Sequence, residues 1–304
     1  MLGIGLVGLG TIARAQHLPA IAATDGLHLA AIASRNAALE GTPCYQNIDA
    51  LLQAEPDIAA ISLCTPPQGR FDQAMAALHA GRHLMLEKPP GATLSEVEAL
   101  QAEATARGLT LFATWHSREA AAVDSARDWL VGKTLRSVTI DWREDVRKWH
   151  PGQEWIWAAG GLGVFDPGIN ALSILTKLVA GVILVSADLH IPQGRATPIA
   201  ADLHLRAGNV PITAGFDWRL DHDEIWRISL TTDQGTLLLD DGGARATIDG
   251  TPLIAGENHE YARLYARFRD LIATRQSEVD LAPLRLVADA FLTGTHHPTA
   301  PFQS

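Results

Sequence analysis

Residues 2–19 read LGIGLVGLGTIARAQHLP, and this stretch decides the fold. A short apolar run breaks at GLGTIA, residues 8–13, and is followed by sequence typical of a helix. G-x-G-x-x-A between a strand and a helix predicts a dinucleotide-binding turn. Gly8 permits the tight turn, Gly10 lets the backbone approach a pyrophosphate, and Ala13 lets helix pack closely on strand. The N–H groups at the helix start attract phosphate, so the expected cofactor contacts here are Gly8, Gly10, Thr11 and Ile12.

Strand-like and helix-like segments alternate through the first third of the chain. Apolar runs lie at 4–8, 27–34, 58–64, 83–86 and 109–114, and helix-like stretches at 12–24, 69–80 and 95–107 follow the first, third and fourth of them. Strands that are apolar on both faces and separated by helices are typical of a parallel sheet covered on both sides. We therefore predict an α/β Rossmann domain, a doubly wound parallel sheet that binds NAD(P), over residues 1–119.

The pattern changes after about residue 120. Apolar and polar residues alternate over 136–144, and similar segments recur at 184–190, 201–206, 212–218, 224–231 and 236–239. This alternation predicts a C-terminal α+β domain over 120–304, with an open, mainly antiparallel sheet for substrate binding and dimerisation. Helices are expected at about 258–275 and 283–293, the second of them as a candidate to pack back on the first domain.

Length, charge and cysteine content limit the class of protein. A chain of 304 residues accommodates two domains of ordinary size. A net charge of -10 without a basic cluster argues against nucleic acid or an anionic membrane as partner, and favours a small molecule. Cys44 and Cys64 have neither the spacing of a disulfide framework nor that of a zinc site. We therefore expect a cytoplasmic protein without a metal.

The end of the second predicted strand bears on cofactor choice. An acidic residue there would bind the ribose 2'-hydroxyl of NAD. The chain instead has Ser34 and Arg35, a hydroxyl and a guanidinium that suit a 2'-phosphate. We expect NADP to be preferred, with NAD still able to bind. The alternative is that Arg35 is a solvated loop charge.

Two further motifs extend the pattern. CTPP at 64–67 follows the third apolar run, and GRHLMLEKPP lies at 81–90. With the fingerprint at residue 8, they make the whole chain resemble the Gfo/Idh/MocA oxidoreductase family, whose signature E-K-P falls here at 87–89. The resemblance implies a cis peptide at Lys88-Pro89 and a cofactor contacted by Cys64, Thr65, Pro66, Glu87 and Lys88.

Lys88 is the first catalytic candidate. It follows a parallel strand at the carboxyl end, where ligands bind in such sheets. The resemblance implies that it holds a substrate hydroxyl and assists proton movement. The alternative is a surface lysine in a loop. Arg70 stands where the family often has histidine, in its T-P-x-x-x-H run, and its role is open.

The second catalytic candidate lies in GGLGVFDPGIN, residues 160–170. This segment resembles the family's G-G-G-x-x-x-D-x-G-x-H, except that Asn170 replaces the usual histidine base. Asparagine cannot accept a proton, so we expect Asp166, or a relay linked to Lys88, to be the base. An Asp before a Pro is also typical of a helix N-cap, and Asp166 could serve in both ways or as a cap alone. The predicted catalytic residues are Lys88, Asp166 and Asn170.

Tryptophan is concentrated between these elements. Residues 141–157 contain four of the chain's eight tryptophans. Aromatic faces suit the C–H faces of sugars, whose hydroxyls seek carboxylates and imidazoles. The alternative is that these rings fill a core or a dimer interface. Glu144 and His150 match positions that contact the sugar in the aldose-oxidising members of the family, so the predicted substrate contacts are His116, Glu144, Trp149, His150, Asp166 and Asn170.

Within the family, the chain looks most similar to the L-arabinose and D-galactose (aldose) 1-dehydrogenases. That resemblance implies oxidation of an aldose, of the L-arabinose, D-galactose or D-fucose type, at the anomeric carbon to the sugar lactone, with hydride going to NADP. Two alternatives remain: a dehydrogenase or reductase of another polyol, ketone or imine with the same fold, and a non-catalytic NADP-binding regulator. An open sheet often packs in symmetric pairs, so a homodimer is expected.

Overall fold

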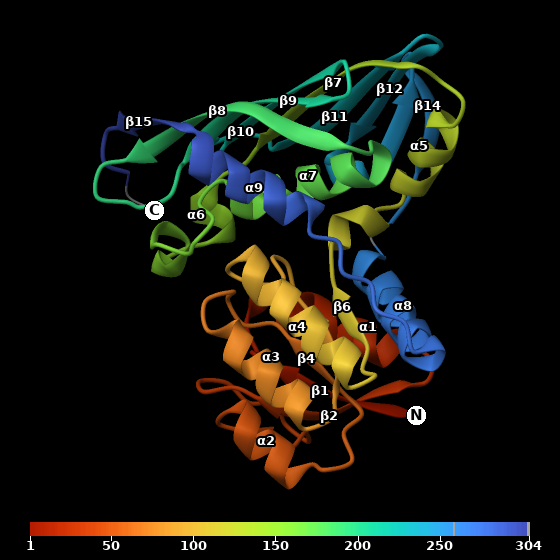
Figure 1. The fold of residues 1–304 in the computed structure, drawn as a ribbon, viewed down its shortest axis with the longest axis vertical. Coiled ribbons are helices and arrows are strands. Elements are labelled where there is room, and N and C mark those ends of the chain that lie inside the picture. Colours follow the sequence, from red (N-terminus) through yellow and green to blue (C-terminus); the bar gives the residue numbers. More distant parts are fainter. Residues whose placement is uncertain (258, 303–304) are drawn as a thin grey trace. The chain divides into compact units, whose positions relative to one another are not determined.

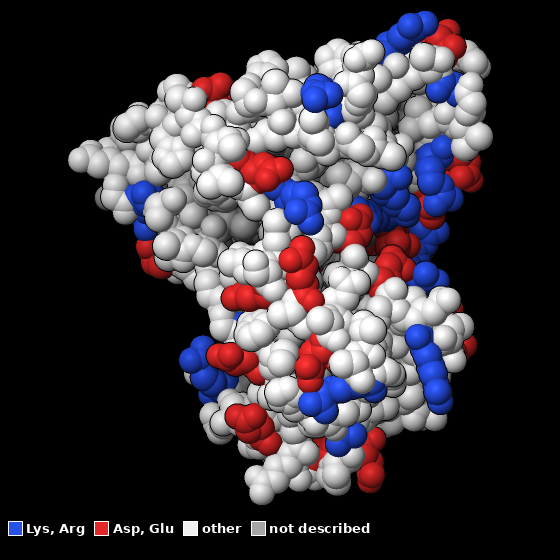
Figure 2. Space-filling view, in the orientation of Figure 1, with Lys and Arg blue, Asp and Glu red and all other residues white. Residues whose placement is uncertain are grey.

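A computed structural model describes residues 1–257 and 259–302 (Figure 1). The chain forms two compact units. The first comprises Met1–His116 and Glu260–Asp280, and the second comprises Ser117–His259 and the chain from Leu281 onward. Among the described residues, no helix is both long and apolar enough to span a membrane. Acidic and basic side chains are interspersed on the face drawn in Figure 2.

The first unit contains the parallel sheet that the sequence predicts. Its strand order is β3-β2-β1-β4-β5-β6, the order of a doubly wound dinucleotide-binding sheet. The chain reverses its direction of strand addition between β1 and β4, and ligands bind at the carboxyl ends beside such a point. The strands are β1 (Leu2–Val7), β2 (Leu27–Ala33), β3 (Cys44–Tyr45), β4 (Ala60–Leu63), β5 (His83–Leu86) and β6 (Leu111–Ala113).

Helices cover both faces of this sheet. One face carries α2 (Ile48–Ala54), α3 (Arg70–His79) and α4 (Leu94–Ala106). The other carries η1 (Ala13–His17), a π-helical turn, with α1 (Leu18–Ala23) and α8 (Glu260–Thr274). In Figure 1, α8 lies beside α1 although the two are far apart in sequence.

The helix that returns to the first unit is α8, and not the predicted segment at 283–293. The chain leaves this unit soon after β6 and returns to it only at α8. The helix α8 then covers apolar side chains of the sheet that would otherwise face water. Phe268 of α8 stacks on Phe112 of β6, with ring centroids 6.2 Å apart. The helix α9 (Ala282–Thr293) belongs instead to the second unit, where Phe291 packs on Phe165 with centroids 5.6 Å apart.

The second unit is built on a nine-stranded sheet of order β14-β13-β12-β11-β7-β10-β9-β8-β15. The prediction of a mainly antiparallel sheet is confirmed, although β7 pairs parallel with β10, and β8 with β15. The strands are β7 (Leu135–Arg143), β8 (Val182–Pro192), β9 (Ala200–Ala207), β10 (Val210–Asp217), β11 (Ile225–Thr232), β12 (Gly235–Asp240), β13 (Arg245–Ile248), β14 (Thr251–Ala255) and β15 (Thr295–Thr299).

Helices of the second unit lie on one face of its sheet, as α7 (Phe165–Leu178) and α9 show in Figure 1. Val138, Ile140 and Trp142 of β7 are buried, as their alternation predicts. The remaining helical segments are η2 (His116–Glu119), α5 (Val123–Leu130), α6 (Val146–Trp149), η3 (Glu154–Trp157) and η4 (Asp241–Gly243).

Candidate active site

The turn after β1 has the geometry of a dinucleotide site. Gly8 has φ +92°, and a Cβ there would lie 3.0 Å from the backbone nitrogen of Thr65, so only glycine fits. A Cβ at Gly10 would meet no described atom within 4 Å beyond its chain neighbours. This open space admits a pyrophosphate at the helix start. The pocket here is lined by Leu9, Gly10, Thr11, Arg14 and Ala15.

The other predicted cofactor residues of the first unit follow the carboxyl ends of neighbouring strands. Ser34 and Arg35 follow β2. The backbone N–H of Ser34 donates to the backbone carbonyl oxygen of Tyr45 at 2.8 Å, and Arg35 is exposed. Thr11 and Ile12 are exposed at the helix start. Cys64, Thr65 and Pro66 follow β4, and Glu87 and Lys88 follow β5. The residues present therefore fit a dinucleotide at this edge of the sheet.

Arg70 joins two of these turns. This first residue of α3 is buried, and its Nε donates to the Thr65 oxygen at 3.0 Å. The same guanidinium donates to the carbonyls of Glu87 and Pro89. The Lys88-Pro89 peptide between them is cis, as the resemblance implied. Arg70 therefore holds the C-T-P turn against the E-K-P turn, a role that its position in the motif did not reveal.

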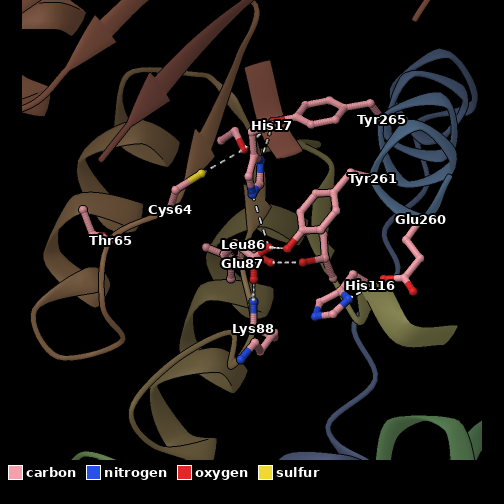
Figure 3. A network of polar contacts seen from close by, with 12 residues as sticks. His17, Cys64, Thr65, Leu86, Glu87, Lys88, His116, Glu260, Tyr261 and Tyr265 are labelled. Carbon is pink, nitrogen blue, oxygen red and sulfur yellow. Dashed lines mark hydrogen bonds and ion pairs between the residues drawn. The ribbon is translucent and has the colours of Figure 1, made fainter. Parts of the chain in front are cut away.

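A buried polar network, on residues other than Arg70, also holds the E-K-P turn (Figure 3). Oε1 of Glu87 lies 3.2 Å from His17 Nε2 and accepts the Tyr261 hydroxyl at 2.6 Å. The other oxygen, Oε2, accepts the backbone N–H of Lys88. Behind His17, the hydroxyl of Tyr265 lies 2.8 Å from Nδ1. The Glu87 side chain thus fixes the backbone of Lys88, and α8 supplies both tyrosines.

The network carries charge in a buried place. Burial alone would raise the pKa of Glu87, but the hydrogen bond and charge of His17 lower it to about 2, helped by His116 and Tyr261. Burial acts to lower the pKa of His17, but Cys64, Tyr265 and Glu87 raise it well above its ordinary value. We therefore treat His17 and Glu87 as a buried ion pair. His116, a predicted sugar contact, lies beside this network, with its Nδ1 2.6 Å from Glu260 Oε2.

Asp166 lies in the first turn of α7 in the second unit. It is not the N-cap: that position belongs to Val164, which makes no side-chain cap bond. The Asp166 N–H already bonds the Gly163 oxygen at 2.9 Å, so its backbone is helical and the cap-only interpretation is wrong. The carboxylate is buried, and its Oδ2 lies 3.1 Å from Nε2 of His150. Asn170 follows one turn later and is half-buried.

Glu144 is a second buried carboxylate in this unit. It follows β7, and its N–H bonds the Asp217 oxygen at 3.0 Å, which extends the parallel pairing of β7 with β10. Its two oxygens accept the indole N–H groups of Trp218 and Trp226, at 3.0 and 2.9 Å. Burial raises the pKa of Glu144 to about 7 against these hydrogen bonds, and the charge of Asp166 adds to the rise.

Aromatic rings surround these polar groups. Trp149 is 44% exposed, and its ring centroid lies 6.0 Å from that of Trp226. His150 lies 5.3 Å from Trp218. Sequence reasoning missed Trp218 and Trp226, although both lie in or beside predicted strands, because no pattern told which strands flank β7. Conversely, two of the four tryptophans in 141–157 are core residues, Trp142 and Trp157.

Comparison with known proteins identifies the family of the chain. Residues 2–114 match the model of an oxidoreductase family with an NAD-binding Rossmann fold, Gfo/Idh/MocA. Together with 46% identity to one relative over 96% of the chain, this match shows that the chain belongs to the Gfo/Idh/MocA family of oxidoreductases.

More particularly, the chain is similar to galactose 1-dehydrogenases. It is 46% identical over 298 residues to that of Pseudomonas fluorescens, which covers 96% of this chain and 95% of that protein. It matches the crystal structure of D-galactose-1-dehydrogenase from Rhizobium etli with a TM-score of 0.95 at 50% identity, covering 99% and 98% of the two chains. A 3-ketoreductase of Actinomadura kijaniata, solved with NADP and TDP-benzene, shares the fold at 19% identity with a TM-score of 0.82, over 98% and 99% of the chains.

Proposed function

We propose that this protein is an NAD(P)-dependent aldose 1-dehydrogenase. It oxidises D-galactose, or a close relative such as D-fucose or L-arabinose, at the anomeric carbon to the lactone. Similarity to two galactose 1-dehydrogenases over nearly the whole chain carries this proposal. Two buried acids, Glu144 bonded to two indole N–H groups and Asp166 beside His150, supply the chemistry that a sugar requires.

Each candidate residue has a distinct role in the proposed reaction. Asp166 accepts the proton of the anomeric hydroxyl, and Lys88 binds that hydroxyl and favours its ionisation. Glu144 and Asn170 bind other hydroxyls, while Trp149 packs on a C–H face of the ring. A nicotinamide bound beside the E-K-P turn supplies the hydride acceptor. Glu87 and Arg70 fix the backbone around Lys88.

An aldose panel tests the proposal. D-galactose, D-fucose, L-arabinose and D-xylose are each assayed for reduction of NADP and NAD. Methyl β-D-galactoside is the matched control, because it keeps the ring but has no free anomeric hydroxyl. Reduction with D-galactose, slowed when deuterium replaces hydrogen at C1, supports the proposal. If every aldose fails, or if the methyl galactoside reacts equally well, oxidation at the anomeric carbon is wrong.

We further propose that NADP is preferred, because Arg35 is exposed just beyond β2, where the 2'-phosphate would lie. Arg35→Ala is expected to raise KM for NADP about tenfold or more and to leave KM for NAD nearly unchanged, since a charged hydrogen bond contributes about 1.5–3 kcal/mol. Steady-state kinetics with both cofactors measure this, with Arg82→Ala as a control elsewhere in the first unit. Equal effects on the two cofactors would contradict the assignment.

Glu144 gives sugar binding a pH dependence. With a pKa of about 7, its carboxylate ionises as the pH rises through neutrality, and a charged acceptor binds hydroxyls more strongly. We expect KM for the sugar to fall between pH 6 and 8. Glu144→Gln should raise KM about tenfold, the effect of about 1.4 kcal/mol, and flatten this dependence. Glu154→Gln, at an exposed glutamate of the same region, is the control; an unchanged pH profile in Glu144→Gln would exclude the role.

We also propose a homodimer formed through the sheet of the second unit. Ile183 and Val185 of β8 are 44% and 60% exposed, an apolar pair on a strand. Val185→Asp is expected to convert the dimer into monomers in light scattering after size exclusion, while Val131→Asp, at another exposed valine, leaves it intact. A wild-type monomer at all concentrations would rule this out.

Both cysteines are free thiols, and the cytoplasm remains the predicted compartment.

A further inference from the structure

The hydrogen bonds around His150 determine which of its nitrogens carries hydrogen. The indole Nε1 of Trp155 lies 2.9 Å from Oε1 of Gln153. An indole N–H only donates, so the atom of Gln153 that faces it must be the accepting oxygen. The same oxygen lies 3.2 Å from Nδ1 of His150. Nδ1 must therefore be a donor and carry a hydrogen.

This assignment leaves the other ring nitrogen as the reactive one. In a neutral imidazole with hydrogen on Nδ1, Nε2 has a lone pair. Nε2 of His150 lies 3.1 Å from Oδ2 of Asp166. A lone pair facing a carboxylate oxygen is unfavourable, whereas one proton between the two atoms makes a charge-assisted hydrogen bond. The geometry therefore raises the affinity of the two side chains, taken together, for a single proton.

We propose that Gln153 is a positioning residue that fixes the tautomer of His150, so that His150 and Asp166 bind and release one proton as a unit. The inference rests on the proposed function. As the anomeric O–H bond breaks, its proton goes to the space between Oδ2 and Nε2. A bound nicotinamide would accept the two electrons of the C1–H bond as hydride, so that the C1–O bond becomes a carbonyl.

Of these two side chains, His150 is the one from which the proton reaches solvent more readily. The His150 side chain is 17% exposed and that of Asp166 is 8% exposed, so the imidazole is the more accessible of the two. Glu144 is a further acid near Asp166, and both its oxygens are occupied by indole N–H groups. Glu224 is also near Glu144, and its charge is paired with that of Lys148.

Two substitutions of Gln153 should move the pH profile in opposite directions. In Gln153→Leu, His150 can place its hydrogen on Nε2 and donate to the Asp166 carboxylate, which stabilises the deprotonated pair. In Gln153→Glu, a charged acceptor keeps hydrogen on Nδ1 and stabilises the imidazolium. The acid limb of kcat/KM against pH should therefore shift by at least about half a pH unit, downward in Gln153→Leu and upward in Gln153→Glu.

The kinetic experiment uses the full-length enzyme with D-galactose and its preferred cofactor. Trp155→Phe removes the donor that orients the amide, and should give a smaller shift in the direction of Gln153→Leu. A purely structural role would lower activity in both Gln153 variants without opposite shifts. Shifts of the same sign, or none, overturn the proposal.

Nitrogen-15 NMR of the imidazoles provides a readout that does not need activity. We expect the His150 signals of the protein without sugar to show hydrogen on Nδ1 when the ring is neutral, and Gln153→Leu to move it to Nε2. Comparison with His150→Gln assigns the signals among the twelve histidines. Hydrogen on Nε2 in the wild-type ring overturns the inference, even if aldoses are oxidised. Hydrogen on Nδ1 with every aldose inactive retains the tautomer assignment and rejects only the proposed function.

Discussion

Asp166→Asn is expected to lower kcat for D-galactose by about 10²–10⁴-fold, the range for loss of a general base. The amide keeps the size of the side chain but cannot accept the hydroxyl proton. The fold should be retained, because the carboxylate is not the cap of α7. Single-turnover measurement of cofactor reduction would show the decrease in the chemical step itself.

An acidic residue in the first turn of another helix provides a control, because changing it alters only the interaction with the helix dipole. Asp49 has this position in α2 and is exposed. Asp49→Asn removes a favourable interaction with the helix dipole, worth about 0.3–1 kcal/mol, and should leave kcat unchanged. If Asp166→Asn retained a third or more of the wild-type kcat, Asp166 would not be the base, and the relay through Lys88 would become the mechanism to test.

His17→Leu is expected to lower the free energy of unfolding by about 3–5 kcal/mol, because it leaves the buried Glu87 carboxylate without its ionic partner. His28→Leu, the same change at an exposed histidine of β2, should have little effect. Urea unfolding followed by circular dichroism measures both. A loss below about 1 kcal/mol in His17→Leu would show that Tyr261 and the Lys88 N–H suffice to hold Glu87.

The ion pair also gives wild-type stability a definite pH dependence. The folded pKa of Glu87, about 2, lies below its ordinary value of 4.5, so its contribution is present above pH 4.5 and is lost as the pH falls toward 2. That contribution is about 3 kcal/mol at 1.36 kcal/mol per unit. The pKa of His17 is raised, so its contribution is present below pH 6.5 and is lost as the pH rises through the folded value. Acid dependence as steep in His17→Leu as in the wild type would contradict the pairing.

Local sequence predicted the features that depend on a few neighbouring residues. The turn at Gly8 and the strand before Lys88 are of this kind, because a fixed backbone path needs fixed residue types. Alternation over β7 likewise revealed which of its side chains are buried. The positions of Glu144 and Asp166 were chosen by resemblance, and both side chains are buried in the structure.

The partners of those residues come from distant segments, and sequence alone could not supply them. Tyr261 reaches Glu87 from α8, 174 positions later in the chain. Trp226 reaches Glu144 because β11 pairs with β7, a choice made by the whole sheet. Arg70 stands where the family often has histidine, and the sequence did not indicate its role. Its guanidinium connects two turns by donating to backbone carbonyls, which leave no pattern in the sequence. Pattern reasoning finds functional residues more readily than the residues that hold them.

Because α8 comes late in the chain, the first unit cannot complete its folding until most of the protein has been synthesised. Residues 1–116 emerge from the ribosome well before Glu260, by roughly 7–30 s at 5–20 residues per second. Throughout that interval Ile4, Met85 and Phe112 lack the helix that covers them, and Glu87 lacks Tyr261. The nucleotide-binding half therefore cannot finish folding before the other half has been made. No single truncation of the gene yields the complete first unit, because its residues come from two separate stretches. A fragment that ends at His116 should therefore fold only when a peptide of residues 260–280 is added.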